Sequence, residues 1–343
     1  MNTALAQVIQ HADYWRGASQ SRIPGAEHVP YKEWQHFVVF HADWVLVFNL
    51  NIDRIGDPVG DSQAARVITI FSANDWTGQV DQCVTPTLKR GEISATFGDA
   101  GMEWRNGGYE IWQQRGEVKL NIKLQPVSIP SLTHNIPLGT GSHLSWCLIP
   151  RLSASGWLES NGKRISFENL SAYHDHNWGR FHWGGDFSWE WGAAVPNDSD
   201  SPWTLVYARM NSKNRNAITA TSVFLLENGK HVRYFRNAEV EFSAGDEFDP
   251  KISGRIPAAA ALLLPDQDLD VPTCTTINAR RGDDWLTANV RAHNRGQVLV
   301  PSEIDYCKVV RLNEASAEVN VFGRCAGRDV AFSGPGLLEI VRA

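Results

Sequence analysis

Apolar and polar residues alternate with a period of two along much of the chain. Between Trp44 and Ile52 every second residue is large and apolar, and between Val118 and Leu124 apolar and polar residues alternate without exception. Successive side chains of an extended strand point to opposite faces, so this period is typical of strands with one buried face. The pattern predicts a chain built mainly from half-buried β-strands.

Turn signals between these segments predict tight hairpins. Asn-Gly pairs stand at 106–107, 161–162 and 228–229, and this pair readily adopts the positive φ angles of a two-residue hairpin turn. The second of these turns predicts a hairpin whose returning strand runs from Ser166 to Asn177. The glycine-rich segments 98–101 and 334–336 are predicted to be turns as well. Antiparallel meanders are therefore expected in place of βαβ units.

Few segments have a helical pattern. Only the first dozen residues and the run Ala258–Leu264 look helical, and the latter, closed by Pro265, is too short to span a membrane. Many strands with few helices predict an all-β fold of sandwiches or barrels. Because 343 residues exceed one hydrophobic core, two tandem antiparallel domains are predicted, 21–182 and 183–343, with the boundary near Trp183.

Composition and motif searches exclude several classes of function. The net charge is -6 and no basic run with interleaved aromatic residues occurs, so nucleic acid is not an expected partner. The N-terminus has neither the basic region nor the apolar run of a signal peptide, which favours a cytoplasmic location. Five widely spaced cysteines without a CxxC pair favour reduced thiols over a disulfide framework or structural zinc. Without a phosphate-binding loop, dinucleotide fingerprint or nucleophile elbow, no cofactor is expected.

One segment concentrates reactive side chains: Tyr173-His174-Asp175-His176-Asn177-Trp178-Gly179. Half of the chain's fourteen tryptophans lie between Trp146 and Trp203. Strand alternation would place Tyr173, Asp175 and Asn177 on one face and His174, His176 and Trp178 on the other. A proton-handling group in an aromatic pocket is the interpretation that follows.

Asp175 is the candidate for the chemistry. A carboxyl group surrounded by indoles loses hydration, which raises its pKa and lets it act as a general acid, with Tyr173 orienting it or relaying the proton. Indole faces would also stabilise a developing carbocation. The alternative is that Asp175 caps a turn among ordinary core tryptophans. His174, His176 and His182, with Asp175 or Asp186, could also bind a metal, but no motif marks a separated third ligand, so no metal is predicted.

Three further clusters contribute candidates. Glu33 could orient a motif histidine or serve as a partner acid, or could simply form a salt bridge at a strand edge. His143 and Trp146 begin the hairpin that leads to the motif and could lie near Asp175, although a lone histidine at a strand start is more often a surface residue. Trp189 and Trp191 share one strand face, which suits a pocket wall or a core strand equally.

The motif from Ala172 to Gly179 resembles the Tyr-x-Asp-His-x-Trp-Gly signature of the lipocalin-like superfamily of carotenoid 1,2-hydratases (hydroxyneurosporene synthases) and AttH-like proteins. Tocopherol cyclase and the fungal decalin-forming Diels-Alderases are similar more distantly. Three further segments agree in order: Glu33-Trp34 resembles an early Glu-Trp-Trp-Tyr element, Trp189-Glu190-Trp191 resembles a Trp-Asp-Trp strand, and the segment 334–339 resembles a closing Gly-x-Gly-x-x-Glu.

This resemblance implies a sandwich-like domain followed by a lipocalin-like barrel, with a cofactor-free aromatic site. It further implies that Tyr173 and Asp175 protonate an isoprenoid alkene, with His143 and Trp146 nearest to an upstream histidine and tryptophan of the family. The segment Glu33-Trp34-Gln35 lacks the second tryptophan of the family's early element, and Glu190 stands where the family's Trp-Asp-Trp strand has aspartate. The resemblance therefore does not imply a carotenoid substrate.

The leading hypothesis is a cofactor-independent hydratase or cyclase that protonates an alkene of an apolar polyene or terpenoid-like substrate between the two domains. A pericyclic cyclase and a non-catalytic lipid-binding protein are the alternatives. The expected partner is a hydrophobic small molecule, and a peripheral membrane contact is one route for its access. The candidate catalytic residues are Asp175, Tyr173, His176, His143 and Glu33, and the candidate substrate-binding residues are Trp178, Trp146, Trp189, Trp191, Trp34 and His174.

Overall fold

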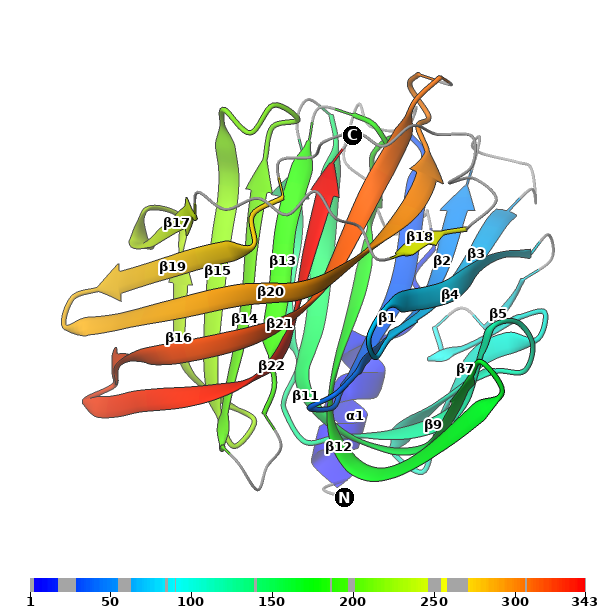
Figure 1. Ribbon diagram of the computed structural model, residues 1–343, viewed down its shortest axis with the longest axis horizontal. Helices are drawn as coiled ribbons and strands as arrows, with labels where there is room; N and C mark the ends of the chain where they lie inside the picture. The colour runs from blue at the N-terminus through cyan, green and yellow to red at the C-terminus, as the bar shows by residue number, and fades with distance from the viewer. Residues whose placement is uncertain are drawn as a thin grey trace. The chain divides into compact units, whose positions relative to one another are not determined.

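The computed structural model of the chain describes residues 3–17, 29–54, 63–83, 86–89, 91–138, 141–185, 187–196, 201–245, 254–257, 271–305 and 307–342. Within these ranges the regular structure is β, apart from helix α1 (Thr3–Ala12) and the short 3-10 helix η2 (Asn237–Glu239). The strands form two sheets whose neighbours are antiparallel except for one short parallel pair (Figure 1). The predicted all-β class is confirmed.

The chain packs as two compact units. Unit 1 comprises 1–39, 46–71 and 77–182, and unit 2 comprises 40–45, 72–76 and 183–343. The predicted domain limits, 21–182 and 183–343, stay a prediction, because compact packing does not show that either half folds alone.

Twelve strands of the described chain form the first sheet. Their order is β4 (Trp76–Cys83), β3 (Gln63–Ser72), β2 (Val45–Arg54), β1 (Tyr31–Phe40), β12 (Lys163–Arg180), β11 (His143–Ser160), β9 (Val118–Pro126), β8 (Gly108–Gln113), β7 (Ala100–Arg105), β6 (Ser94–Phe97) and β5 (Thr87–Leu88), with β10 (Ser131–Pro137) paired to β11. The predicted strands around 44–52 and 118–124 are β2 and β9. Strand β12 lies between β1 and β11 and carries the seven-residue motif.

The Asn-Gly turns form as the sequence predicts. Asn161 and Gly162 have φ angles of 51° and 71° and join β11 to β12, so the hairpin that carries the motif is confirmed. The pairs at 106–107 and 228–229 also have positive φ at both positions and join β7 to β8 and β15 to β16. The turn sets the register of β11 and β12 near the hairpin end, and two irregularities of the ladder lie between this part and the motif.

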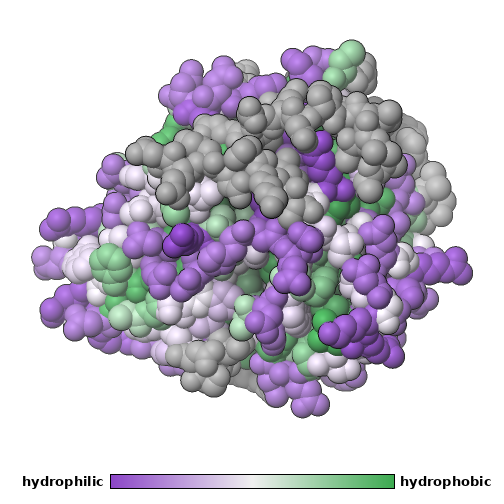
Figure 2. Space-filling model, viewed as in Figure 1, coloured by the Kyte–Doolittle hydropathy of each residue, from purple (hydrophilic) through white to green (hydrophobic). Residues whose placement is uncertain are grey.

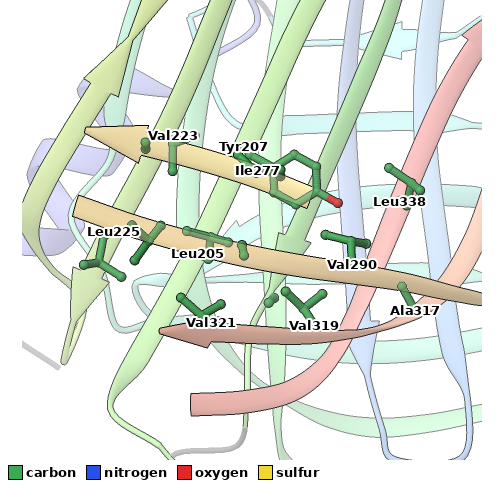
Figure 3. Packing of buried hydrophobic residues seen from close by; sticks show 14 of the residues in the cluster. Leu205, Tyr207, Val223, Leu225, Ile277, Val290, Ala317, Val319, Val321 and Leu338 are labelled. Carbon is green, nitrogen blue, oxygen red and sulfur yellow. The ribbon is translucent and has the colours of Figure 1, made fainter. Parts of the chain in front are cut away.

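Ten strands of the described chain form the second sheet. They are β16 (Lys230–Arg236), β15 (Ile218–Glu227), β14 (Trp203–Asn211), β13 (Ser188–Ala194), β22 (Arg328–Arg342), β21 (Val309–Cys325), β20 (Asp284–Pro301), β19 (Cys274–Arg281) and β17 (Val240–Ala244), with β18 (Gly254–Ile256) parallel to β20. In Figure 1 the long strands β19 to β22 run across β13 to β16. Apolar residues from both groups of strands, among them Leu205, Tyr207, Val290, Val319 and Leu338, fill the space enclosed (Figure 3).

Three other predictions can be scored. The N-terminal helix is confirmed as α1, and the segment Ala258–Leu264 lies outside the described residues. The predicted turn at 334–336 is wrong, because these residues continue strand β22. Glycine is needed there for close packing: a Cβ on Gly336 would lie 2.8 Å from the backbone oxygen of Ala193.

None of the described helices is long and apolar enough to cross a membrane. On the face of the molecule drawn in Figure 2, hydrophilic residues cover most of the described surface, and hydrophobic residues show between them in small groups.

Candidate functional site

Strand β12 presents two different sets of side chains. We call the side that carries Tyr173, Asp175 and Asn177 the Asp175 face, and the side that carries His174 and His176 the network face. Partners directly opposite in antiparallel strands point to the same side of a sheet, so the register with β1 and β11 assigns the neighbours of each face. The division predicted from strand alternation is observed.

On the Asp175 face, three alternate residues of β12, namely Tyr173, Asp175 and Asn177, form a hydrogen-bonded row. The hydroxyl of Tyr173 donates to Oδ2 of Asp175 at 2.8 Å, and Nδ2 of Asn177 donates to Oδ1 at 2.5 Å. Asp175 is 5 % exposed and Tyr173 is fully buried. Both carboxylate oxygens are thus held in place by their strand neighbours.

Two tryptophans flank this row. Trp34 of β1 and Trp146 of β11 are the register partners of Asn177 on its two sides, so both indoles are on the Asp175 face. They lie level with Asn177, two residues along β12 from Asp175. Both are buried, and Trp34 meets Phe181 edge-on with ring centroids 6.0 Å apart. The structure therefore brings together Asp175, Tyr173, Trp34 and Trp146 of the predicted site.

His36 completes the Asp175 face and was not among the predicted site residues. It is the β1 register partner of Asp175, and its Nδ1 is 3.3 Å from Nδ2 of Asn49 on β2. Burial, and after it the charge of His174, lowers the pKa of His36 to about 3, so its imidazole is neutral at ordinary pH. A neutral imidazole beside Asp175 can take part in hydrogen bonding to a substrate.

On the network face, His174 and His176 contact two carboxylates. Nε2 of His174 is 2.9 Å from Oδ2 of Asp13, and Nε2 of His176 is 2.9 Å from Oε1 of Glu33. Nδ1 of His176 is 3.1 Å from Oδ1 of Asp13, while Nδ1 of His174 donates to the backbone oxygen of His36 at 2.9 Å. All four side chains are at most 1 % exposed.

Hydrogen-bond donors and imidazoles surround the two carboxylates. Glu33 accepts the backbone N–H groups of Arg16 and Gly17 and the hydroxyl of Tyr31, and Asp13 accepts the hydroxyl of Tyr109 at 2.5 Å. Hydrogen bonds and charge from His176 lower the pKa of Glu33 against the opposing effect of its burial. The same two carboxylates raise the pKa of His176, although its burial acts in the other direction. The network face is therefore a buried ionic network.

Asp13 follows helix α1 directly and is a network member that sequence reasoning missed. It is 161 residues from His174 in the chain, and no spacing motif connects the two. The available signal was weak: an acidic residue between the apolar-faced N-terminal helix and Trp15. Glu33, in contrast, orients a motif histidine, which is one of the roles considered for it.

Other predicted site residues lie away from the Asp175 face. His143 is the register partner of Arg180 at the end of β11, on the network side of the sheet. Trp178 is on that side too, where the guanidinium of Arg16 stacks 3.8 Å from its ring centroid. The assignments of His143, His176, His174, Glu33 and Trp178 to catalysis or substrate binding stay predictions.

Trp189 and Trp191 lie in unit 2 beside a second carboxyl pair. Glu314 and Glu339 are directly paired between β21 and β22, and Trp191 is the β13 partner of Glu339. The indole N–H of Trp189 donates to Glu339. Burial raises the pKa of both carboxyl groups, and their proximity raises that of Glu314 further. Glu339 is the glutamate that ends the segment 334–339 of the sequence analysis, and Glu314 was not predicted.

The metal alternative finds no geometric support within the described ranges. No group of three His, Cys, Asp or Glu side chains there converges as metal ligands would. The ring nitrogens of His174 and His176 face the protein oxygens named above, and Asp186 lies outside the described residues.

No family model matches the sequence, and no curated protein matches it. The fold defines a class of two-sheet all-β proteins, in which solved structures match nearly the full chain. A putative AttH protein (NE1406) from Nitrosomonas europaea aligns with a TM-score of 0.63 and 12 % identity over 94 % of each chain. Kievitone hydratase from Nectria haematococca aligns with a TM-score of 0.60 and 12 % identity over 97 % of each chain. CghA with Sch210972 aligns with a TM-score of 0.56 and 13 % identity, over 92 % of this chain and 88 % of that one. At these identities the likeness shows a shared fold.

Proposed function

We propose that the protein is a cofactor-independent enzyme that protonates a carbon-carbon double bond of an apolar, terpenoid-like substrate with Asp175. The observation that carries the proposal is the row of Tyr173, Asp175 and Asn177 on one face of β12, with Trp34 and Trp146 beside it. The fold likeness to a hydratase supports hydration as the reaction, and the structure of CghA with Sch210972 supports a small-molecule ligand.

The geometry suggests how the proton would be held. Oδ1 of Asp175 accepts a hydrogen bond from Nδ2 of Asn177. A proton on the carboxyl group would therefore be carried by Oδ2, next to the hydroxyl of Tyr173. The two donated hydrogen bonds favour the carboxylate in the free protein. An apolar substrate that covers Asp175 would exclude water and favour the neutral acid. Protonation would then be coupled to substrate binding.

The chemical step balances without a cofactor. The carboxyl proton is transferred to one alkene carbon, whose π electrons form the new C–H bond, and the other carbon becomes cationic. Trp34 and Trp146 would stabilise this cation by about 0.5–2 kcal/mol for each well-placed ring. Water adds to the cation and returns a proton to Asp175 in hydration. In cyclisation a second double bond attacks, and loss of a proton restores the acid.

Asp175→Asn tests the proposal. We expect turnover to fall by about 10²- to 10⁴-fold, the usual contribution of a general acid, while the far-ultraviolet circular dichroism spectrum stays unchanged. Glu168→Gln is the matched control, because it makes the same carboxylate-to-amide change at an exposed position of β12 and should leave turnover unchanged. Near-normal turnover of the Asp175 variant would remove Asp175 from the acid role.

Heavy water separates this mechanism from the alternatives. A panel of terpenoid alkenes is incubated with the protein in deuterium oxide, and the products are analysed by mass spectrometry. Alkene protonation places one deuterium on carbon, whereas a pericyclic cyclase converts the substrate without incorporation. A lipid-binding protein returns the ligand unchanged.

A further inference from the structure

We propose that the substrate carries a hydrogen-bond donor, a hydroxyl or an amide N–H, which is recognised by the side-chain oxygens of Asn49 and Asn51. This inference rests on the proposed function, because it names the substrate class of the same site. A pure hydrocarbon would leave both oxygens without a partner.

The two asparagines are on the Asp175 face. Asn49 Nδ2 is 3.3 Å from Nδ1 of His36, which is the register partner of Asp175. Asn51 is two positions along β2 and so points to the same side of the sheet. Asp53, two positions further, confirms this direction, because its Oδ1 is 3.1 Å from Nζ of Lys32, which lies on the same side of β1 as His36.

Their oxygens are buried and have no partner. Asn49 and Asn51 are 8 % and 6 % exposed, and neither Oδ1 accepts a hydrogen bond from any described residue. Asp53, the third polar residue of this row, has ion-pair partners at both oxygens, Lys32 and Arg66. The row thus ends in an ion pair, while the two side-chain oxygens of Asn49 and Asn51 on the Asp175 face accept no hydrogen bond from the described residues.

Unused buried acceptors are unusual and destabilising. More than nine in ten buried polar groups in folded proteins have a hydrogen-bond partner, and asparagine is disfavoured within strands. In β2 the asparagines alternate with Phe48, Leu50 and Ile52, which form the apolar side of the strand. A ligand that donates a hydrogen bond to these oxygens would account for their presence at this site. Neutral amide oxygens carry two lone pairs and no proton, so the group they accept must be a donor.

Matched ligand pairs test this inference. Farnesol and farnesyl methyl ether share a skeleton and an oxygen, but only the alcohol has a donor hydrogen, and 2-naphthol with 2-methoxynaphthalene forms a second such pair. Binding is measured by tryptophan fluorescence and isothermal titration calorimetry. We expect wild-type protein to bind the donor of at least one pair about tenfold more tightly than its methylated partner.

The variant Asn49→Leu/Asn51→Leu should lose this preference and bind both members of each pair equally. Asn51→Leu alone removes an unpaired oxygen and leucine has a similar volume, so the melting temperature of this single variant should rise by about 2–4 °C. Asn49→Leu also removes the hydrogen bond to Nδ1 of His36, so the double variant tests only the preference. Asn121→Leu, the same change on β9, is the control. It should leave the preference for the donor unchanged and should not raise the melting temperature.

Three results would overturn the inference. The first is no preference for the donor in either pair, including no binding at all. The second is an unchanged preference in the double variant, and the third is an Asn51→Leu variant that is less stable than wild type. The variant Asp175→Asn keeps the two inferences apart, since it should retain the preference for the donor. Equal binding of donor and ether contradicts only the assignment of Asn49 and Asn51. Normal turnover of the Asp175 variant contradicts only the acid role.

Discussion

The two faces of β12 both carry buried polar groups, but they use their hydrogen-bonding capacity differently. On the network face, the carboxylates of Asp13 and Glu33 are surrounded by imidazoles, a tyrosine hydroxyl and backbone N–H groups. On the Asp175 face, Asn49 and Asn51 keep oxygens with no donor from the described chain. The charged groups of the network face have ionic partners within the protein, although the side-chain oxygen of Gln35 on that face also lacks a donor from the described chain.

This difference separates structural from functional polarity. A buried ionic network needs full internal compensation, because each uncompensated charge costs several kcal/mol. A binding face must instead leave some groups unused until the ligand arrives, at a cost to the stability of the free protein. In the motif, His174 and His176 contact the carboxylates of Asp13 and Glu33, whereas Tyr173 and Asp175 lie on the opposite face.

Removing one member of the network should have the largest effect on stability. His176→Leu deletes the cation between Asp13 and Glu33 and leaves both carboxylates with too few partners. We expect a loss of about 3–5 kcal/mol in the free energy of unfolding, measured by urea denaturation. His293→Leu changes an exposed histidine and should stay within about 0.5 kcal/mol of wild type. A loss below about 1 kcal/mol for His176→Leu would mean that the network is not ionic.

Histidines on the two faces should give opposite pH dependence. The pKa of His36 falls from 6.5 to about 3 on folding, so the unfolded chain binds the extra proton between these values and stability decreases as the pH falls below 6.5. The pKa of His176 is raised above 6.5, so its contribution is complete below that pH and is lost as the pH rises through the folded value. Glu33 and Asp13, with lowered pKa values, add a further loss when the pH falls below their unfolded values of 4.5 and 3.8.

The contribution of these two histidines should therefore be greatest near pH 6.5, with each titrating histidine adding a slope on the order of 1 kcal/mol per pH unit. Glu314 and Glu339, whose pKa values burial raises, and His143 and His231, whose pKa values burial lowers, also titrate in the folded protein, so the contribution of His36 is measured as a difference between variant and wild type. Urea denaturation of wild type and His36→Gln at a series of pH values gives this difference, which should change by about 1 kcal/mol per pH unit between pH 4.5 and 6.5 and stay constant above that range. A difference that does not vary with pH would show that His36 is not buried in its neutral form.

Much of this arrangement is local and could be predicted from the sequence. The alternation of apolar and polar residues predicted the strands, and the Asn-Gly pairs predicted the hairpins. The same period of two predicted which motif residues lie on each face of β12. The network could not be predicted, because Asp13 and His174 meet only through the order of strands in the sheet, across 161 residues. Asn49 and Asn51 are visible in the sequence as amides at alternate positions of an apolar strand, where asparagine is uncommon.

The smallest effect should come from Tyr173→Phe, which removes one hydrogen bond from Asp175. Asn177 still donates to Oδ1, so the carboxylate of Asp175 keeps one hydrogen-bond donor. We expect a loss of about 1 kcal/mol in the free energy of unfolding. Tyr109→Phe removes the same type of bond from Asp13, which is completely buried, and should cost about 1.5–3 kcal/mol. Urea denaturation of both variants compares the faces directly, and a Tyr173 variant that loses more than its Tyr109 counterpart would mean that the Asp175 face, too, is held mainly for stability.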